Sequence, residues 1–92
     1  PLILSKGTIR WKNLEKGQIL YSGDILRTDK NSLIAIIFDE GSELKMNNNT
    51  EIVILSTESV KLRFGSIWMK SERFYIRTSV ANIFSEYLNW QK

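Results

Sequence analysis

Acidic side chains are the first candidates for chemistry in this chain, because it contains neither His nor Cys. Without imidazole or thiolate, the usual general base near neutral pH, the common zinc ligands and a cysteine nucleophile are all missing. The carboxylates are scattered singly, apart from the adjacent pair Asp39 and Glu40. Neighbours on a strand point to opposite faces, so this pair favours a solvated turn over a catalytic site. We expect a protein that is not an enzyme.

Two further aspartates have the setting of turn residues. Asp24 follows Gly23, and we expect its carboxylate to accept hydrogen bonds from turn amides rather than to act as an acid. Residues 29–32 (Asp-Lys-Asn-Ser) resemble the start of a calcium loop, but the five-position ligand pattern and the distal glutamate are missing. The sequence therefore predicts no metal and no cofactor.

Aromatic side chains are the next candidates, because flat rings stack on sugars and bases. Trp11 alternates in register with Ile9, and Trp68 lies in an apolar segment, so core packing is favoured for both. Trp90 stands in polar company near the end of the sequence. Candidate interaction residues are Trp68, Tyr75 and Trp90.

Positive charge exceeds negative charge by three, which gives a pI near 9.4. The basic residues expected to face outward are Arg10, Lys12, Lys61, Arg63, Lys70, Arg73 and Arg77. Acidic residues are interspersed among them and no nucleic-acid-binding signature accompanies them, so a solvated face is favoured over a site for single-stranded nucleic acid. We expect no nucleic-acid partner.

Length and apolar content fit one domain over residues 1–92 with a single modest core. The longest apolar run, residues 33–38, is far below the roughly 20 residues needed to span a bilayer. No membrane span is expected in this segment. A sequence that starts at Pro1 without a targeting signal is expected to be a domain excised from a longer chain.

Apolar and polar residues alternate with period two over residues 8–12, 43–46 and 60–64, as in half-buried strands. Residues 33–38 and most of 51–55 are apolar on both faces, which predicts strands at the centre of the core. Turn residues interrupt the strands every 8 to 12 positions or so, the rhythm of an all-β domain. The pattern predicts an all-β domain, and the family resemblance described below implies a twisted solenoid-like fold or a sandwich of short strands.

The spacing of three glycines bears on that choice. Gly17, Gly41 and Gly65 are 24 residues apart (41 − 17 and 65 − 41), as stacked turns of a solenoid would produce, but the copies match poorly. Near the end of the chain, the apolar spacing over residues 80–88 predicts an amphipathic helix, although residues 87–91 also alternate as in a strand.

An ordered set of turn and strand motifs gives the chain a resemblance to a known family. These motifs are Gly7-Thr8-Ile9-Arg10-Trp11, Leu14, Gly17, Leu20, Gly23-Asp24-Ile25-Leu26-Arg27-Thr28, Ser32, Ile34 to Phe38, Gly41-Ser42, Leu44, Thr50-Glu51-Ile52, Val60 to Gly65, and Phe74-Tyr75-Ile76-Arg77-Thr78. The chain resembles the FecR protein domain over residues 7–78. Residues expected to carry the structural motif are Gly17, Gly23, Asp24, Thr28, Gly41, Ser42, Gly65 and Thr78.

The resemblance departs from the family pattern at two places. The turn Asp39-Glu40-Gly41-Ser42 has one residue more than the family's Asp-Gly-Ser turn, and residues 85–88 lack its closing Gly-Thr.

The resemblance implies a sensory domain in the periplasm or cell envelope that belongs to an anti-sigma regulator. Its implied partner is another protein, such as the signalling domain of an outer-membrane receptor, and the signal passes by protein–protein contact. An exposed strand edge that accepts a partner strand would provide that contact. The alternative is an envelope carbohydrate-binding or scaffold module that uses Trp68, Tyr75 or Trp90.

Overall fold

The computed structural model describes residues 1–38, 41–70, 75–78 and 83–85, and all the regular structure in this part of the chain is β-strand. The strands are β1 (Leu2–Leu4), β2 (Lys12–Asn13), β3 (Ile25–Arg27), β4 (Ile34–Ile37), β5 (Glu43–Met46), β6 (Glu51–Ser56), β7 (Ser59–Phe64), β8 (Ile67–Lys70), β9 (Tyr75–Thr78) and β10 (Ile83–Ser85). The expected all-β class is confirmed. None of the described residues belongs to a helix long and apolar enough to cross a membrane.

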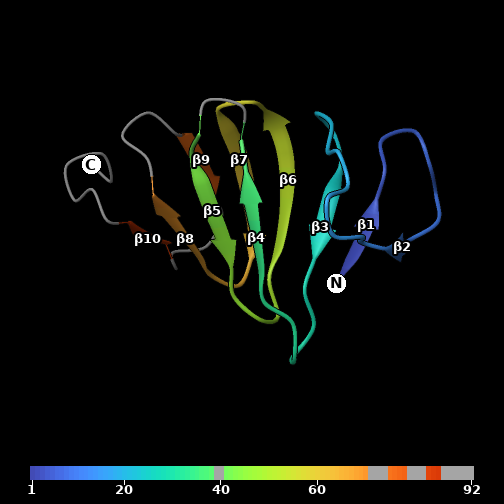
Figure 1. Ribbon diagram of the computed structural model, residues 1–92, viewed down its shortest axis with the longest axis horizontal. Helices are drawn as coiled ribbons and strands as arrows, with labels where there is room; N and C mark the ends of the chain where they lie inside the picture. The colour runs from blue at the N-terminus through green and yellow to red at the C-terminus, as the bar shows by residue number, and fades with distance from the viewer. Residues whose placement is uncertain (39–40, 71–74, 79–82, 86–92) are drawn as a thin grey trace.

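Two open sheets form the molecule. Sheet A has the strand order β2-β1-β3-β6-β7-β9, and sheet B has the order β10-β8-β5-β4. Neighbours are antiparallel except that β9 runs parallel to β7 and β10 runs parallel to β8. Sheet A continues past the edge of sheet B, so that β3, β1 and β2 lie to the right of β4 in Figure 1. One side of the sandwich is therefore wider than the other.

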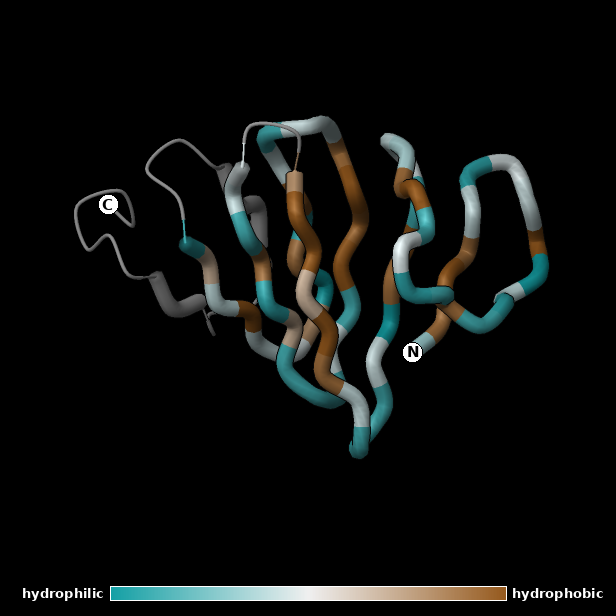
Figure 2. Tube along the Cα trace, viewed as in Figure 1, coloured by the Kyte–Doolittle hydropathy of each residue, from teal (hydrophilic) through white to brown (hydrophobic). Residues whose placement is uncertain are grey.

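The core lies between the inner faces of the two sheets. Its buried apolar side chains are Ile3, Leu26, Ile36, Phe38, Leu44, Met46, Ile52, Ile54, Val60, Leu62, Ile67 and Met69. They alternate with outward-facing residues along the strands, and Figure 2 shows this as hydrophobic segments interrupted by hydrophilic ones. The prediction of half-buried strands over residues 43–46 and 60–64 is confirmed, except that Phe64 is 41% exposed beside a β-bulge.

Within residues 1–38 and 41–70, three corners carry the chain from one sheet to the other. The segments that follow β3, precede β6 and follow β7 all cross at the same end of the sandwich (Figure 1). Successive crossings at one end are the feature that this sandwich shares with a solenoid.

The sequence predictions are wrong in two segments and not confirmed in a third. Residues 8–11 are a loop rather than a strand, and Ile9 is 99% exposed, because the chain turns at Ser5–Thr8 and pairs with β1 only at Lys12 and Asn13. The run 33–38 forms the edge of sheet B rather than the centre of the core. The helix expected over 80–88 is not confirmed: Ile83–Ser85 form β10, where pairing with β8 determines the conformation, and the rest of that span lies outside the described residues.

Candidate functional site

Asp24 joins the first strand to the turn that precedes β3. Its side chain is buried, and one carboxylate oxygen accepts the backbone N–H of Lys6 at 2.9 Å while the other accepts that of Tyr21 at 2.8 Å. These bonds confirm that Asp24 accepts hydrogen bonds from turn amides. Gly23 donates its N–H to the carbonyl of Ile54 in β6, and Ile54 donates back to the carbonyl of Asp24. The Gly-Asp pair therefore attaches this turn to both neighbouring strands.

Thr28 and Thr50 hold the three corners together. The Thr28 hydroxyl donates to the carbonyl of Asn47 at 2.6 Å and accepts the N–H of Thr50 at 3.0 Å. The hydroxyl of Thr50 accepts the N–H of Ser66 and lies within donating distance of two carbonyls, that of Asn48 at 2.9 Å and that of Ser66 at 3.1 Å. Gly65, with φ of 88°, packs against Thr50 so closely that no Cβ fits. The corners are thus connected through buried hydroxyls.

The remaining motif residues are placed apart from these two clusters. Gly17 and Gly41 lie in exposed turns with open space around them, and Ser42 is buried next to the start of β5. Thr78 is the last residue of β9. The structure brings together Thr28 and Gly65 through Thr50, and it leaves the other motif glycines separate.

The candidate interaction aromatics do not form a common surface in the described residues. Trp68 is half-buried on the outer face of sheet B, with the ammonium of Lys45 at 4.7 Å from its ring centroid. Tyr75 begins β9 in sheet A. Trp90 lies outside the described residues. The prediction of core packing for Trp11 and Trp68 is wrong: neither belongs to the core, and the half-buried Trp11 lies under the guanidinium of Arg27 at 4.5 Å.

A buried carboxylate that the sequence did not single out lies on the outer face of sheet A. Arg27 contacts one oxygen of Glu51 at 2.6 Å through Nη2, and Arg63 contacts the other at 3.2 Å through Nε. The Glu51 side chain is 4% exposed, whereas both arginines are nearly half exposed. Opposite charges on three neighbouring strands thus stabilise this face as an ion-pair cluster.

Metal binding finds no support in the described residues. No group of three or more carboxylates there could hold a metal ion. The hydroxyl of Ser32 and the N–H of Asn31 donate to the carboxylate of Asp29, which lowers the pKa of Asp29 below its ordinary value. A carboxylate held ionised at the surface is a turn acceptor rather than a general acid.

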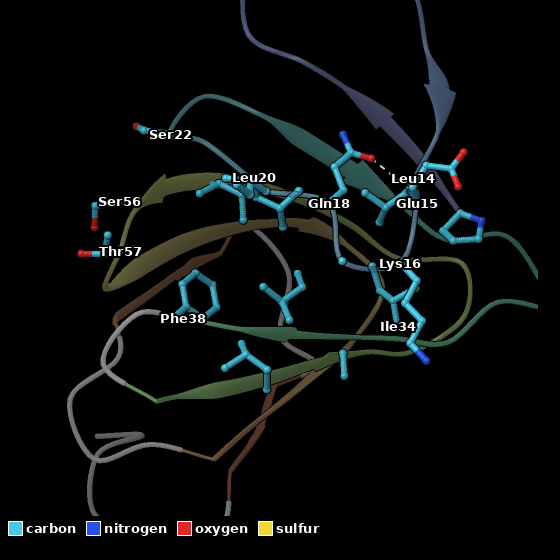
Figure 3. Close-up of a pocket in the computed structure, with 17 residues that line it drawn as sticks. Leu14, Glu15, Lys16, Gln18, Leu20, Ser22, Ile34, Phe38, Ser56 and Thr57 are labelled. Atoms are coloured by element: carbon cyan, nitrogen blue, oxygen red, sulfur yellow. Dashed lines mark hydrogen bonds between the residues drawn. The ribbon is translucent and has the colours of Figure 1, made fainter.

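An apolar groove lies between β4 and the loop of residues 14–20 (Figure 3). Its volume is about 810 Å³, within the range of ligand-binding pockets. Ile34, Ile36 and Phe38 form one wall, Leu14 and Leu20 the other. Sheet A provides the floor, because Ile54 of β6 also lines the groove.

Strand β4 borders this groove with an edge that pairs with no other strand in the described part of the chain. Phe38 donates its N–H to the carbonyl of Ser42, and the register continues through Ile36 opposite Leu44. Alternate residues of an antiparallel strand bond to the same neighbour, so Ile34 and Ile36 bond toward β5, whereas the N–H and C=O groups of Ala35 and Ile37 point to the free edge. This edge is a template for another strand.

Sequence reasoning did not locate the groove, although it raised an exposed strand edge as a mode of contact. The run 33–38 carries apolar residues on both faces, and this pattern is the same for a central strand and for an edge strand. The structure shows Leu33 to be 72% exposed and Ile37 to be 67% exposed. Only the strand order reveals that nothing in the described part of the chain pairs with this edge.

Comparison with known proteins gives no relative on which to base an assignment: no protein family model, no curated protein and no solved structure matches the chain.

Proposed function

We propose that this chain is a non-enzymatic interaction domain of the FecR type, which receives a signal outside the cytoplasm by binding an extended segment of another protein along β4. The observation that carries the proposal is the free edge of β4 beside an apolar groove. Strand addition of this kind obtains affinity from main-chain hydrogen bonds and specificity from pockets for alternate side chains. Both components are present here.

The outer face of the same strand supports this proposal. Leu33, Ala35 and Ile37 are all exposed and point away from the core. Edge strands that must stay unpaired usually carry a lysine, a proline or a bulge. Residues 33–38 contain neither lysine nor proline, and the pairing of β4 with β5 has no bulge. The edge therefore has no feature that opposes the addition of a strand.

Trp68 does not support the carbohydrate alternative. Sugars bind by stacking on an open ring face, and the ammonium of Lys45 lies over the ring of Trp68. Strand addition therefore explains more of the described structure than glycan binding does.

Amide hydrogen exchange with a strand-forming probe tests the proposal. We expect the acetylated peptide Lys-Thr-Val-Thr-Val-Thr-Lys to slow exchange at the amides of Ala35 and Ile37. The amide of Ile36 should change little, because it already bonds to β5. Uniform protection of all three amides, or of none, would contradict strand addition.

A matched pair of variants isolates the backbone contact. Ala35→Pro removes an N–H that faces the free edge and leaves the bonds to β5 intact, since proline is tolerated on edge strands. We expect it to abolish peptide binding, whereas Ala35→Ser, which retains the N–H, should bind normally. Titration with peptidoglycan fragments is the companion measurement, and shifts at the indole of Trp68 would favour the carbohydrate alternative.

A further inference from the structure

From the groove we infer the chemistry of the segment that it binds: two apolar residues separated by one small residue, followed by a carboxylate, in an extended segment antiparallel to β4. This inference rests on the proposed function and specifies the ligand of the same site.

Register determines the apolar positions. In an antiparallel pair, residues directly opposite each other share a face of the sheet. A residue of the added strand opposite Ala35 therefore points outward, as Ala35 does, while the residues opposite Ile34 and Ile36 point into the groove. Two inward positions separated by one outward position define the spacing.

The groove walls determine the nature of the inward residues. Leu14 and Leu20 pack against the core from the loop, and Ile54 forms the floor. Figure 3 shows the side chains of Leu20 and Ile34 on opposite sides of the opening. Polar side chains in this space would lose water without gaining a partner, so apolar side chains are favoured.

Lys16 gives the segment its charge and its direction. Lys16 lines the groove at the end where Ile34 lies, whereas the side chain of the preceding residue, Glu15, points the opposite way (Figure 3). In the part of the chain that the structure describes, no carboxylate lies within ion-pair distance of Lys16. An antiparallel strand leaves the groove past Ile34 with its C-terminal end, so a carboxylate two residues after the second apolar residue points inward and meets this ammonium group.

The width of sheet A favours a single extended segment over the edge of a second copy. Antiparallel edge pairing between two copies requires a two-fold axis perpendicular to the sheet at β4. Since β3, β1 and β2 extend past β4 (Figure 1), the two copies of sheet A would occupy the same space beyond that axis. A separate strand meets no such obstacle above β3 and β6.

Peptides of identical composition test the spacing. The matched peptide is acetylated Lys-Thr-Val-Ser-Ile-Thr-Asp-Lys, and the shifted peptide, Lys-Thr-Val-Ile-Ser-Thr-Asp-Lys, places its apolar residues on opposite faces. Titrations followed by the amide signals of the labelled protein should give about tenfold tighter binding for the matched peptide, as expected for one apolar side chain withdrawn from the groove. Equal affinities would overturn the inferred spacing.

A charge exchange tests the role of Lys16. Replacing the aspartate of the matched peptide by lysine should weaken binding by about threefold to fivefold, the range of a partly exposed ion pair. With Lys16→Glu the preference between these two peptides should reverse. An unchanged preference would overturn the assigned carboxylate.

The outcomes distinguish this inference from the proposed function. If the matched and shifted peptides bind equally and Ala35→Pro abolishes the binding of both, the inferred spacing is refuted and strand addition is supported. Binding of every peptide to Ala35→Pro refutes both. If sedimentation shows dimers of the wild-type chain but not of Ala35→Pro, the strand that occupies the edge belongs to a second copy of this chain and not to a partner.

Discussion

Replacing Gly65 by alanine tests whether the close contact between Gly65 and Thr50 stabilises the fold. Gly65 has φ of 88°, and a Cβ there would lie 2.5 Å from the Cα of Thr50 and 2.6 Å from the carbonyl oxygen of Asn49. Both are backbone atoms, so no change of rotamer relieves the overlap. The backbone of the corner must move, and the hydroxyl bonds of Thr50 to Ser66 must lengthen with it.

The expected loss has two parts. The left-handed backbone conformation costs an alanine about 1–2 kcal/mol relative to glycine. Overpacking of a close contact adds about 1–3 kcal/mol. Gly41 separates the two, because its φ is 94° and nothing lies within 4 Å of a Cβ there. Gly41→Ala should therefore lose only the first part, and Gly65→Ala should lose both.

Urea unfolding followed by tryptophan fluorescence gives the free energy of unfolding of each variant, and equal m-values make the comparison valid. We expect Gly65→Ala to be less stable than Gly41→Ala by about 1–3 kcal/mol. Losses equal within about 0.5 kcal/mol would refute the argument from close packing. If Gly65→Ala does not fold, Thr50→Val tests the same corner, because it keeps the side-chain shape and removes only the hydroxyl.

Three further predictions concern polar side chains. Asp24→Ala leaves two backbone amides without their acceptor and should lower the free energy of unfolding by about 2–4 kcal/mol in urea titrations; a loss below about 1 kcal/mol would contradict the role of the carboxylate. Arg27→Met leaves the buried carboxylate of Glu51 with one cation in place of two and should lower the free energy of unfolding by about 1–3 kcal/mol in the same assay. Wild-type stability of this variant would refute the stabilising role of the ion pair. Ser32→Ala should raise the pKa of Asp29, measured by carbon NMR titration. Because the folded-state pKa is lowered, the stability that Asp29 contributes is present above its unfolded pKa and is lost as pH falls through the folded pKa; this acid-dependent loss should shrink in the variant.

Strands with one buried face could be predicted from the sequence. Leu44 and Met46 in β5, and Val60 and Leu62 in β7, alternate with charged residues and are all buried. In these two strands the alternation of apolar residues matches the alternation of buried side chains, because each strand has a neighbour on both sides. Phe64 departs from the pattern because a β-bulge shifts the pairing of β6 with β7 between Glu51 and Ile52.

The hydrogen bonds of the turn at Asp24 could also be predicted from the sequence. The Gly-Asp dipeptide predicted a carboxylate that accepts turn amides, and these hydrogen bonds form with residues 3 and 18 positions away. The loop over residues 8–11 was not readable, because Ile9 and Trp11 have the period of a strand although no neighbouring strand pairs with them. The pattern of a segment does not show whether a neighbour is available.

The groove depends on strand order, and strand order is a property of the whole chain. The side chains of β4 have the same pattern in the middle of a sheet and at its edge. Sheet A must extend past β4 before a floor exists under the opening, and the loop of residues 14–20 must return above that floor. Neither condition is written in the residues that line the groove.

The composition of the edge argues that its exposure has a use. A single lysine at Ala35 or Ile37 would protect the edge from pairing, and because both side chains already face solvent it would cost the core nothing. The chain instead places exposed apolar residues on this edge, and its charged residues form an ion-pair cluster elsewhere, around Glu51. An unprotected edge is a liability in a protein that only has to remain folded. It is a requirement in a protein that must accept a strand, and the adjoining groove supplies the space for that strand's side chains.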